Sequence, residues 1–219
     1  YGILASNEVE EPFLDEGLNE YWNYRMLRDT GAELRLSTPL LKSLGIAPLV
    51  EGFAMERAGA PREEPADPLG ANAWERLQGV GPVYVRGATM LRDLEQRIGK
   101  DATERAFKAY YQRWKFRHPY PADLREAWRD AGVEAEWFFQ TMQTQRRFDM
   151  ALTRVQRGAD SLQLTVKNRG RLSAPFSVTA LRDGRPLQTR WYPAPATRKQ
   201  TVAFPALDAD AFVLDHERT

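Results

Sequence analysis

The chain has 219 residues, of which 42% are hydrophobic, 11% aromatic and 28% charged. This composition is typical of a folded globular protein and excludes an intrinsically disordered chain. Lys and Arg number 31 against 30 Asp and Glu, so the formal net charge is +1. A charge this close to zero argues against nucleic acid and anionic membrane surfaces as partners. No apolar run approaches the ~20 residues that cross a bilayer, so we expect no membrane segment.

Cysteine is absent, which excludes disulfides, thiol nucleophiles and Cys-bound zinc. The two histidines, His118 and His216, lie far apart in the sequence and neither has a His neighbour. A zinc site with two His ligands from within this chain is therefore not expected. We expect His118 to lie in an exposed turn and His216 to be solvated.

Helical periodicity dominates residues 1–147. The first helix is predicted from about Pro12 to Asp29, because apolar side chains recur there with helical spacing on one face: Leu18, Tyr21, Trp22 and Met26. Pro12 suits a first helical turn. The stretch from Glu51 to Pro82 is rich in Gly, Pro and paired charges, and it is predicted to be a long loop.

More helices follow this loop. One is predicted to end at Gly99, after Leu91, Leu94 and Ile98 on one face. In the next helix, Asp101 and Glu104 have the spacing of a capping box. Its buried stripe is expected to contain four aromatic residues: Phe107, Tyr110, Tyr111 and Trp114. Shorter helices are predicted around Asp123–Asp130 and up to about Thr144.

Alternation with period 2 begins at Phe148 and predicts short antiparallel strands. Asp183 and Gly184 lie between two such runs and indicate a tight hairpin, because both turn positions need positive φ. Six or so short strands are expected, and five of them are placed at 162–166, 176–181, 188–192, 199–204 and 211–214. The predicted fold class is therefore α+β with segregated domains, a mainly helical part over 1–147 and a small β-sandwich over 148–219.

Two residues are candidates for chemistry. Glu16 and Glu20 share one helical face, where two carboxylates could bind a cation or divide acid and base roles; alternatively, they form a solvated acidic first turn. Gly17 within a helix costs ~1 kcal/mol relative to Ala, which a close approach by backbone or ligand would explain. Tyr84 lies where the long loop gives way to a helix. It could donate a hydrogen bond to a developing oxyanion, or it could simply pack the helix start.

The segment from Glu11 to Tyr21, with the core Leu14-Asp15-Glu16-Gly17, resembles the Trp-Leu-Asn/Asp-Glu-Gly-Phe-Ala-x-Tyr segment of the M1 family of zinc aminopeptidases, the gluzincins. In that family the Glu of this segment is the third zinc ligand. The stretch Val83–Ala88 resembles the family's Tyr-Glu-Lys-Gly-Ala/Phe motif, whose Tyr stabilises the oxyanion. The interval from Glu16 to Tyr84 is 68 residues, which is similar to the family's spacing.

The resemblance implies specific roles and a specific architecture. Glu16 would be a zinc ligand and Tyr84 a catalytic residue in hydrolysis of a peptide substrate by zinc-activated water. The helical domain would correspond to the C-terminal, thermolysin-like half of the catalytic domain, and the β-domain would follow it. By the family's spacing, the second His of the His-Glu-x-x-His motif would lie four residues before Tyr1.

That His-Glu-x-x-His motif and the Gly-x-Met-Glu-Asn motif do not occur in the 219 residues. We therefore expect a fragment of a zinc metallopeptidase that holds no zinc and is inactive alone. Its partner would be the missing N-terminal half of the same polypeptide. Without that half, exposed apolar surface would favour self-association. The alternative hypothesis is a degenerate, non-catalytic gluzincin relative or a protein-interaction module.

Overall fold

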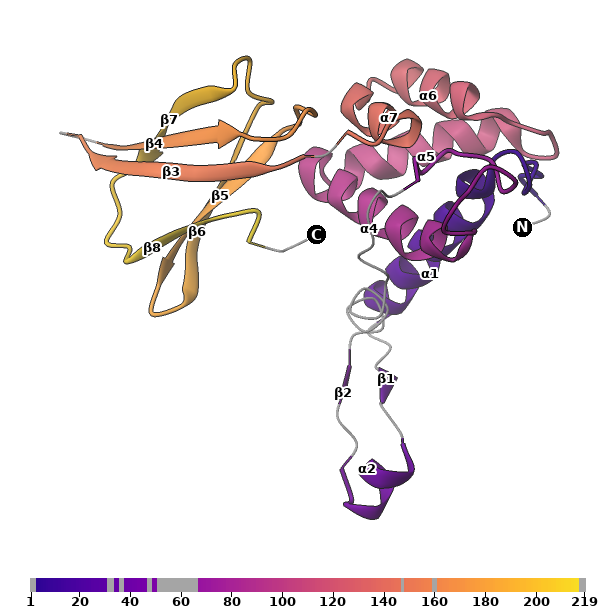
Figure 1. Cartoon of the computed structure of the whole chain (residues 1–219), viewed down its shortest axis with the longest axis horizontal. Helices are drawn as coiled ribbons and strands as arrows, with labels where there is room; N and C mark the ends of the chain where they lie inside the picture. Colours follow the sequence, from indigo (N-terminus) through magenta and orange to yellow (C-terminus); the bar gives the residue numbers. More distant parts are fainter. Residues whose placement is uncertain are drawn as a thin grey trace. The chain divides into compact units, whose positions relative to one another are not determined.

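A helical part followed by a β part makes up the computed structural model of the chain (Figure 1), which is the predicted α+β class. The structure describes residues 3–30, 34–35, 38–46, 49–50, 67–146, 148–158 and 161–216. Half of the predicted loop, residues 51–66, lies outside these ranges. The chain divides into two compact units, Tyr1–Glu134 and Ala135–Thr219.

The first helical segment confirms the helix predicted from Pro12 to Asp29. It opens with a π-helical turn, η1 (Phe13–Gly17), and continues as α1 (Leu18–Asp29). Phe13, Leu14, Leu18 and Tyr21 are buried on its inner face. A π-helical turn of this kind is rare and is often found at functional sites.

Beyond α1 the chain makes a small excursion that the sequence pattern did not predict. Strands β1 (Leu34–Arg35) and β2 (Leu49–Val50) pair antiparallel, and the short helix α2 (Pro39–Ser43) lies between them in the sequence. Thr38 caps α2, since its Oγ1 accepts a hydrogen bond from the Leu41 amide at 3.2 Å.

Helices α4 (Gly81–Ile98) and α5 (Lys100–Trp114) meet at Gly99, whose φ of 87° confirms that a glycine ends α4. The capping box predicted at Asp101 is wrong. Gly99 is the N-cap of α5 and Asp101 lies within its first turn, without a capping hydrogen bond. Instead, the Thr103 hydroxyl donates to the Gly99 carbonyl at 3.0 Å.

Helix α6 (Pro121–Asp130) starts at its proline, which the first turn of a helix accepts. Its capping interaction comes from Asp123, whose Oδ2 accepts a hydrogen bond from the Tyr120 amide at 2.8 Å. Trp128 is fully buried, and its ring packs edge-on against Phe107 of α5 at 5.2 Å between centroids. Both side chains are buried, so this contact belongs to the core of the first unit.

Some of the residues predicted to form the buried stripes of α1 and α5 are exposed, so this part of the prediction is wrong. Met26 is 60% exposed, and Trp22 and Tyr111 are also exposed, while Tyr21, Phe107 and Tyr110 are buried as expected. The periodicity identified the right helices, but it overestimated the width of the face that this chain covers. No described helix combines the length and apolarity needed to cross a membrane.

The second unit contains helix α7 (Glu136–Gln143) and two three-stranded antiparallel sheets. One sheet has the order β3 (Met150–Arg157), β4 (Ser161–Asn168), β7 (Lys199–Pro205). The other has the order β6 (Arg185–Tyr192), β5 (Phe176–Arg182), β8 (Ala211–Leu214). Five of these strands match the predicted ones, and β3 is an addition.

Alternating side chains from both sheets share one core, as expected for a small sandwich. Its buried members come from β4, β5 and β7: Leu162, Leu164, Val166, Phe176, Val178, Ala180, Val202 and Phe204. The predicted hairpin turn joins β5 and β6, with φ of 50° at Asp183 and 72° at Gly184. Both turn positions therefore have the positive φ that a primed turn requires.

Candidate functional site

Two glycines bring the start of α1 against the start of α4. An added Cβ at Gly87 would lie 2.7 Å from the Gly17 Cα, and one at Gly17 would lie 2.7 Å from the Phe13 ring. Real Cβ atoms do not approach backbone as closely as the one at Gly87 would, so that position needs glycine, while a Cβ at Gly17 would have to displace the buried Phe13 ring. The conformational cost of Gly17 within a helix is thus explained by a close approach of two backbones.

The glycine crossing places Glu16 beside Tyr84. Glu16 directly precedes Gly17, and Tyr84 lies one helical turn before Gly87, so the crossing brings the Tyr84 phenol towards the Glu16 carboxylate. Hydrogen bonding to the Glu16 carboxylate, followed by burial and the negative charge of Glu16, raises the pKa of Tyr84 to about 12. The phenol therefore stays protonated near neutral pH and remains a hydrogen-bond donor.

Asp15, next to Glu16, is an unusual buried carboxylate. It is only 4% exposed, and its Oδ1 accepts one long hydrogen bond from Asn19 at 3.4 Å. Its Oδ2 has no hydrogen-bond donor among the residues that the structure describes. Burial, then the charges of Glu8 and Glu16, raise the pKa of Asp15 to about 6. Burial also raises the pKa of Glu11, to about 7, with a further contribution from Glu10. Carboxylates with such raised pKa values often lie at functional sites.

A buried arginine holds the chain in place just before α4. Arg76 is buried, with 7% of the residue exposed. Its guanidinium donates hydrogen bonds to the carbonyls of Gly79 at 2.8 Å and Pro68 at 3.0 Å. The Asp67 carboxylate accepts a hydrogen bond from the Gln78 backbone amide at 2.9 Å. The Asp67 backbone carbonyl accepts one from the Arg86 guanidinium, also at 2.9 Å. These bonds fix the start of α4, and hence Tyr84. No sequence pattern indicates this role of Arg76, because its partners are backbone carbonyls.

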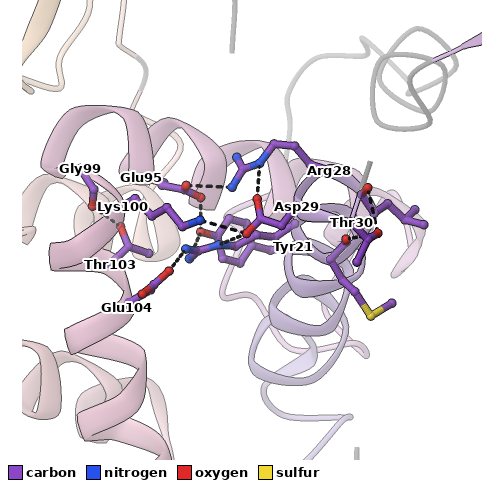
Figure 2. Close-up of polar contacts among 12 residues, drawn as sticks. Tyr21, Arg28, Asp29, Thr30, Glu95, Gly99, Lys100, Thr103 and Glu104 are labelled. Carbon is purple, nitrogen blue, oxygen red and sulfur yellow. Dashed lines mark hydrogen bonds and ion pairs between the residues drawn. The ribbon is translucent and has the colours of Figure 1, made fainter. Parts of the chain in front are cut away.

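Further along α1, an ionic network joins α1 to α4 and α5 (Figure 2). Glu95 of α4 is buried, accepts a hydrogen bond from the Tyr21 hydroxyl, and pairs with Arg28 at 3.0 Å. Because of burial and the Glu95 carboxylate, the pKa of Tyr21 is raised well above its usual range. Helix α1 is thus attached to α4 at two places, the glycine crossing and Glu95.

The same network continues onto α5. The buried guanidinium of Arg25 pairs with Glu104 and lies over the Trp22 ring, 5.0 Å from its centroid. Asp29 pairs with Lys100 at 3.2 Å, and hydrogen bonds from Lys100 and Arg28 lower the pKa of Asp29. The network therefore restricts how α1, which follows Glu16 directly, can move relative to α4, which carries Tyr84.

A cavity of about 700 Å³ lies beside α1 and α5 in the first unit. Its walls are mainly apolar. They include three side chains that were predicted to be buried but are exposed: Trp22, Met26 and Tyr111. Asp15 also lines this cavity. The size is within the ~300–1,000 Å³ of ligand and peptide pockets.

The described residues supply one candidate zinc ligand and not a full set. Among them, no group of three His, Asp or Glu residues could hold a metal ion. His118 is exposed, as predicted, and its Nδ1 lies 2.7 Å from the Ala5 carbonyl oxygen. Glu20, on the same face as Glu16, accepts from Asn23 at 3.4 Å. The carboxylate oxygens of Glu16 could supply one ligand of a zinc site. Of the predicted site residues, Glu16 and Tyr84 lie close together.

Comparison of the chain with known proteins identifies no family for it. No family model matches the chain, and no curated protein matches it at a significant level.

Proposed function

We propose that this chain contributes one side of the active site of a zinc metallopeptidase, with Glu16 as a metal ligand and Tyr84 as the oxyanion donor. The observation that carries the proposal is the glycine crossing, which brings these two residues together so that the Glu16 carboxylate raises the pKa of Tyr84. The two residues belong to separate motifs that lie 68 residues apart in the sequence. A glycine pair that excludes any larger side chain supports their contact.

Each residue has a chemically defined task in this proposal. A bound zinc ion would lower the pKa of a water molecule and polarise the scissile carbonyl of the peptide. The Glu16 carboxylate supplies one oxygen ligand of a type that zinc accepts. Tyr84, whose phenol is protonated at neutral pH, donates a hydrogen bond to the negative charge that develops on the carbonyl oxygen. The remaining ligands would come from polypeptide outside the 219 residues.

The test uses the complete encoded polypeptide that contains these residues. Glu16→Ala should lose most of its bound zinc, measured by elemental analysis, while the matched change Glu20→Ala should keep it. Tyr84→Phe should retain zinc and lose turnover of an aminoacyl-anilide substrate by a factor on the order of 10² to 10³. Full turnover in Tyr84→Phe, or a wild-type protein without zinc and without hydrolysis, would refute the proposal.

A second candidate function is protein interaction by a non-catalytic relative of such peptidases. The apolar cavity of about 700 Å³ favours it, because exposed Trp22, Met26 and Tyr111 line that cavity. In this case the chain should self-associate or bind an apolar peptide segment through the cavity. Sedimentation of the wild-type chain and of Met26→Ser tests self-association through the cavity, and titration of an apolar peptide into both tests the other form: a monomer that binds no peptide would refute this candidate.

A further inference from the structure

The second unit contains a polar cleft of about 440 Å³ that the peptidase proposal does not use. Its walls are the loop 168–173, which follows β4, and the loop 195–198, which precedes β7. Three of the described residues that line it are arginines, Arg146, Arg171 and Arg198, and each comes from a different segment of the chain. None of the described lining residues is acidic.

The described residues of the second unit do not neutralise the positive charge of this cleft. Within the described part of the chain, the guanidinium groups of these three arginines have no hydrogen bond or ion pair. Residues 146–219 carry thirteen Lys and Arg against seven Asp and Glu, whereas residues 1–145 carry eighteen against twenty-three. Three unpaired cations in a locally basic unit repel one another, and a bound anion would remove that cost.

The backbone beneath the arginines is held by hydrogen bonds. Asn168 is buried, and its Nδ2 donates to the Leu172 carbonyl at 2.8 Å while its Oδ1 accepts from the Gly170 amide at 3.0 Å. The Ser173 hydroxyl donates to the Pro195 carbonyl at 2.9 Å, which ties one loop to the other. The backbone amide of Asn168 donates a hydrogen bond to the backbone carbonyl of Arg198 at 2.8 Å. Two of the three arginines therefore start from a fixed backbone, which lowers the entropy lost on binding.

We propose that this cleft binds the phosphate group of a small phosphorylated molecule. A guanidinium presents a planar fork of donors that matches phosphate oxygens, and three forks suit a group with more than one negative charge. A volume of about 440 Å³ is within the ~300–1,000 Å³ of small-molecule sites. The same headgroup chemistry occurs in phospholipids, and the experiment below distinguishes the two sources.

The test measures binding of pyrophosphate to the 219-residue chain by isothermal titration calorimetry at low ionic strength. We expect saturable binding with one site, weakened on the order of tenfold by Arg171→Gln and again by adding Arg198→Gln. The matched control is Arg185→Gln with Arg190→Gln, because both of these residues are exposed on β6 and do not line the cleft. The control pair should leave the affinity unchanged.

Three results would overturn the proposal. The first is no binding of pyrophosphate by the wild-type chain, and the second is an equal loss in the control pair, which would indicate non-specific attraction by net charge. The third is binding to vesicles containing phosphatidic acid without any binding of pyrophosphate. That result would assign the cleft to a lipid surface. Because the arginines are exposed, far-UV circular dichroism should show that all variants fold.

Discussion

Replacing Gly87 with alanine tests the close crossing of α1 and α4. The new Cβ would lie 2.7 Å from the Gly17 Cα, whereas carbon atoms in contact prefer ~3.5–4.0 Å. The obstructing atom belongs to the backbone, so no side chain can rotate away, and the two helices must separate by about 1 Å. Such overpacking costs roughly 1–3 kcal/mol. Alanine's better helix propensity returns about 0.5–1 kcal/mol.

We therefore expect Gly87→Ala to lower the free energy of unfolding by about 1–2 kcal/mol. Separation of the helices should also weaken the interaction of Tyr84 with the Glu16 carboxylate, so the pKa of Tyr84 should fall from about 12 towards its usual 10. Urea unfolding followed by circular dichroism measures the first effect. Spectrophotometric titration of tyrosinate measures the second.

Gly81→Ala is the matched control, because Gly81 also lies in α4 and an added Cβ there would meet no atom within 4 Å. This change should be neutral or slightly stabilising. Equal unfolding midpoints for Gly87→Ala and Gly81→Ala, with an unchanged titration of Tyr84, would refute the reasoning.

Three other changes test the surroundings of the site. Asp15→Asn should stabilise the chain by about 2–3 kcal/mol at pH 8, because the folded state raises the pKa of Asp15 from 3.8 to about 6 and so disfavours its charged form. This gain should shrink as the pH falls from about 6 to 4, and a gain that is constant across pH would contradict it. Glu16→Gln should lower the pKa of Tyr84 from about 12 towards 10, measured by tyrosinate absorbance; an unchanged value would show that Glu16 is not the cause. Glu95→Ala should lower the free energy of unfolding by roughly 1–3 kcal/mol, because it leaves the buried Tyr21 hydroxyl without its acceptor and the half-exposed Arg28 without its ion pair, and no measurable cost would argue against the network.

Local patterns predicted most of the fold. Helical spacing of apolar residues located α1, α4 and α5, and alternation located five of the six strands of the second unit. The hairpin at Asp183 and Gly184 was predictable because few residues tolerate positive φ at two adjacent positions. Asp101 was predicted as a cap because its spacing to Glu104 fits, but the structure starts α5 from Gly99 instead. Cap position depends on where the previous helix stops, which spacing alone does not define.

The candidate site was predictable in its residues but not in its supports. Glu16 and Tyr84 belong to recognisable motifs, and the cost of Gly17 pointed to a close approach. The anchors of the site, Arg76 and Glu95, gave no signal, because their partners are carbonyls and side chains that only the folded chain brings near. The exposure of Met26 was missed for a related reason: periodicity defines an apolar face but not what covers it.

The measurement that tests the central claim most directly is the zinc content of the complete polypeptide with and without the Glu16 carboxylate. One zinc ion per wild-type molecule, retained in Glu20→Ala and lost in Glu16→Ala, is the result that the proposed role of Glu16 predicts. Equal zinc content in all three proteins, or no zinc in any of them, would contradict it.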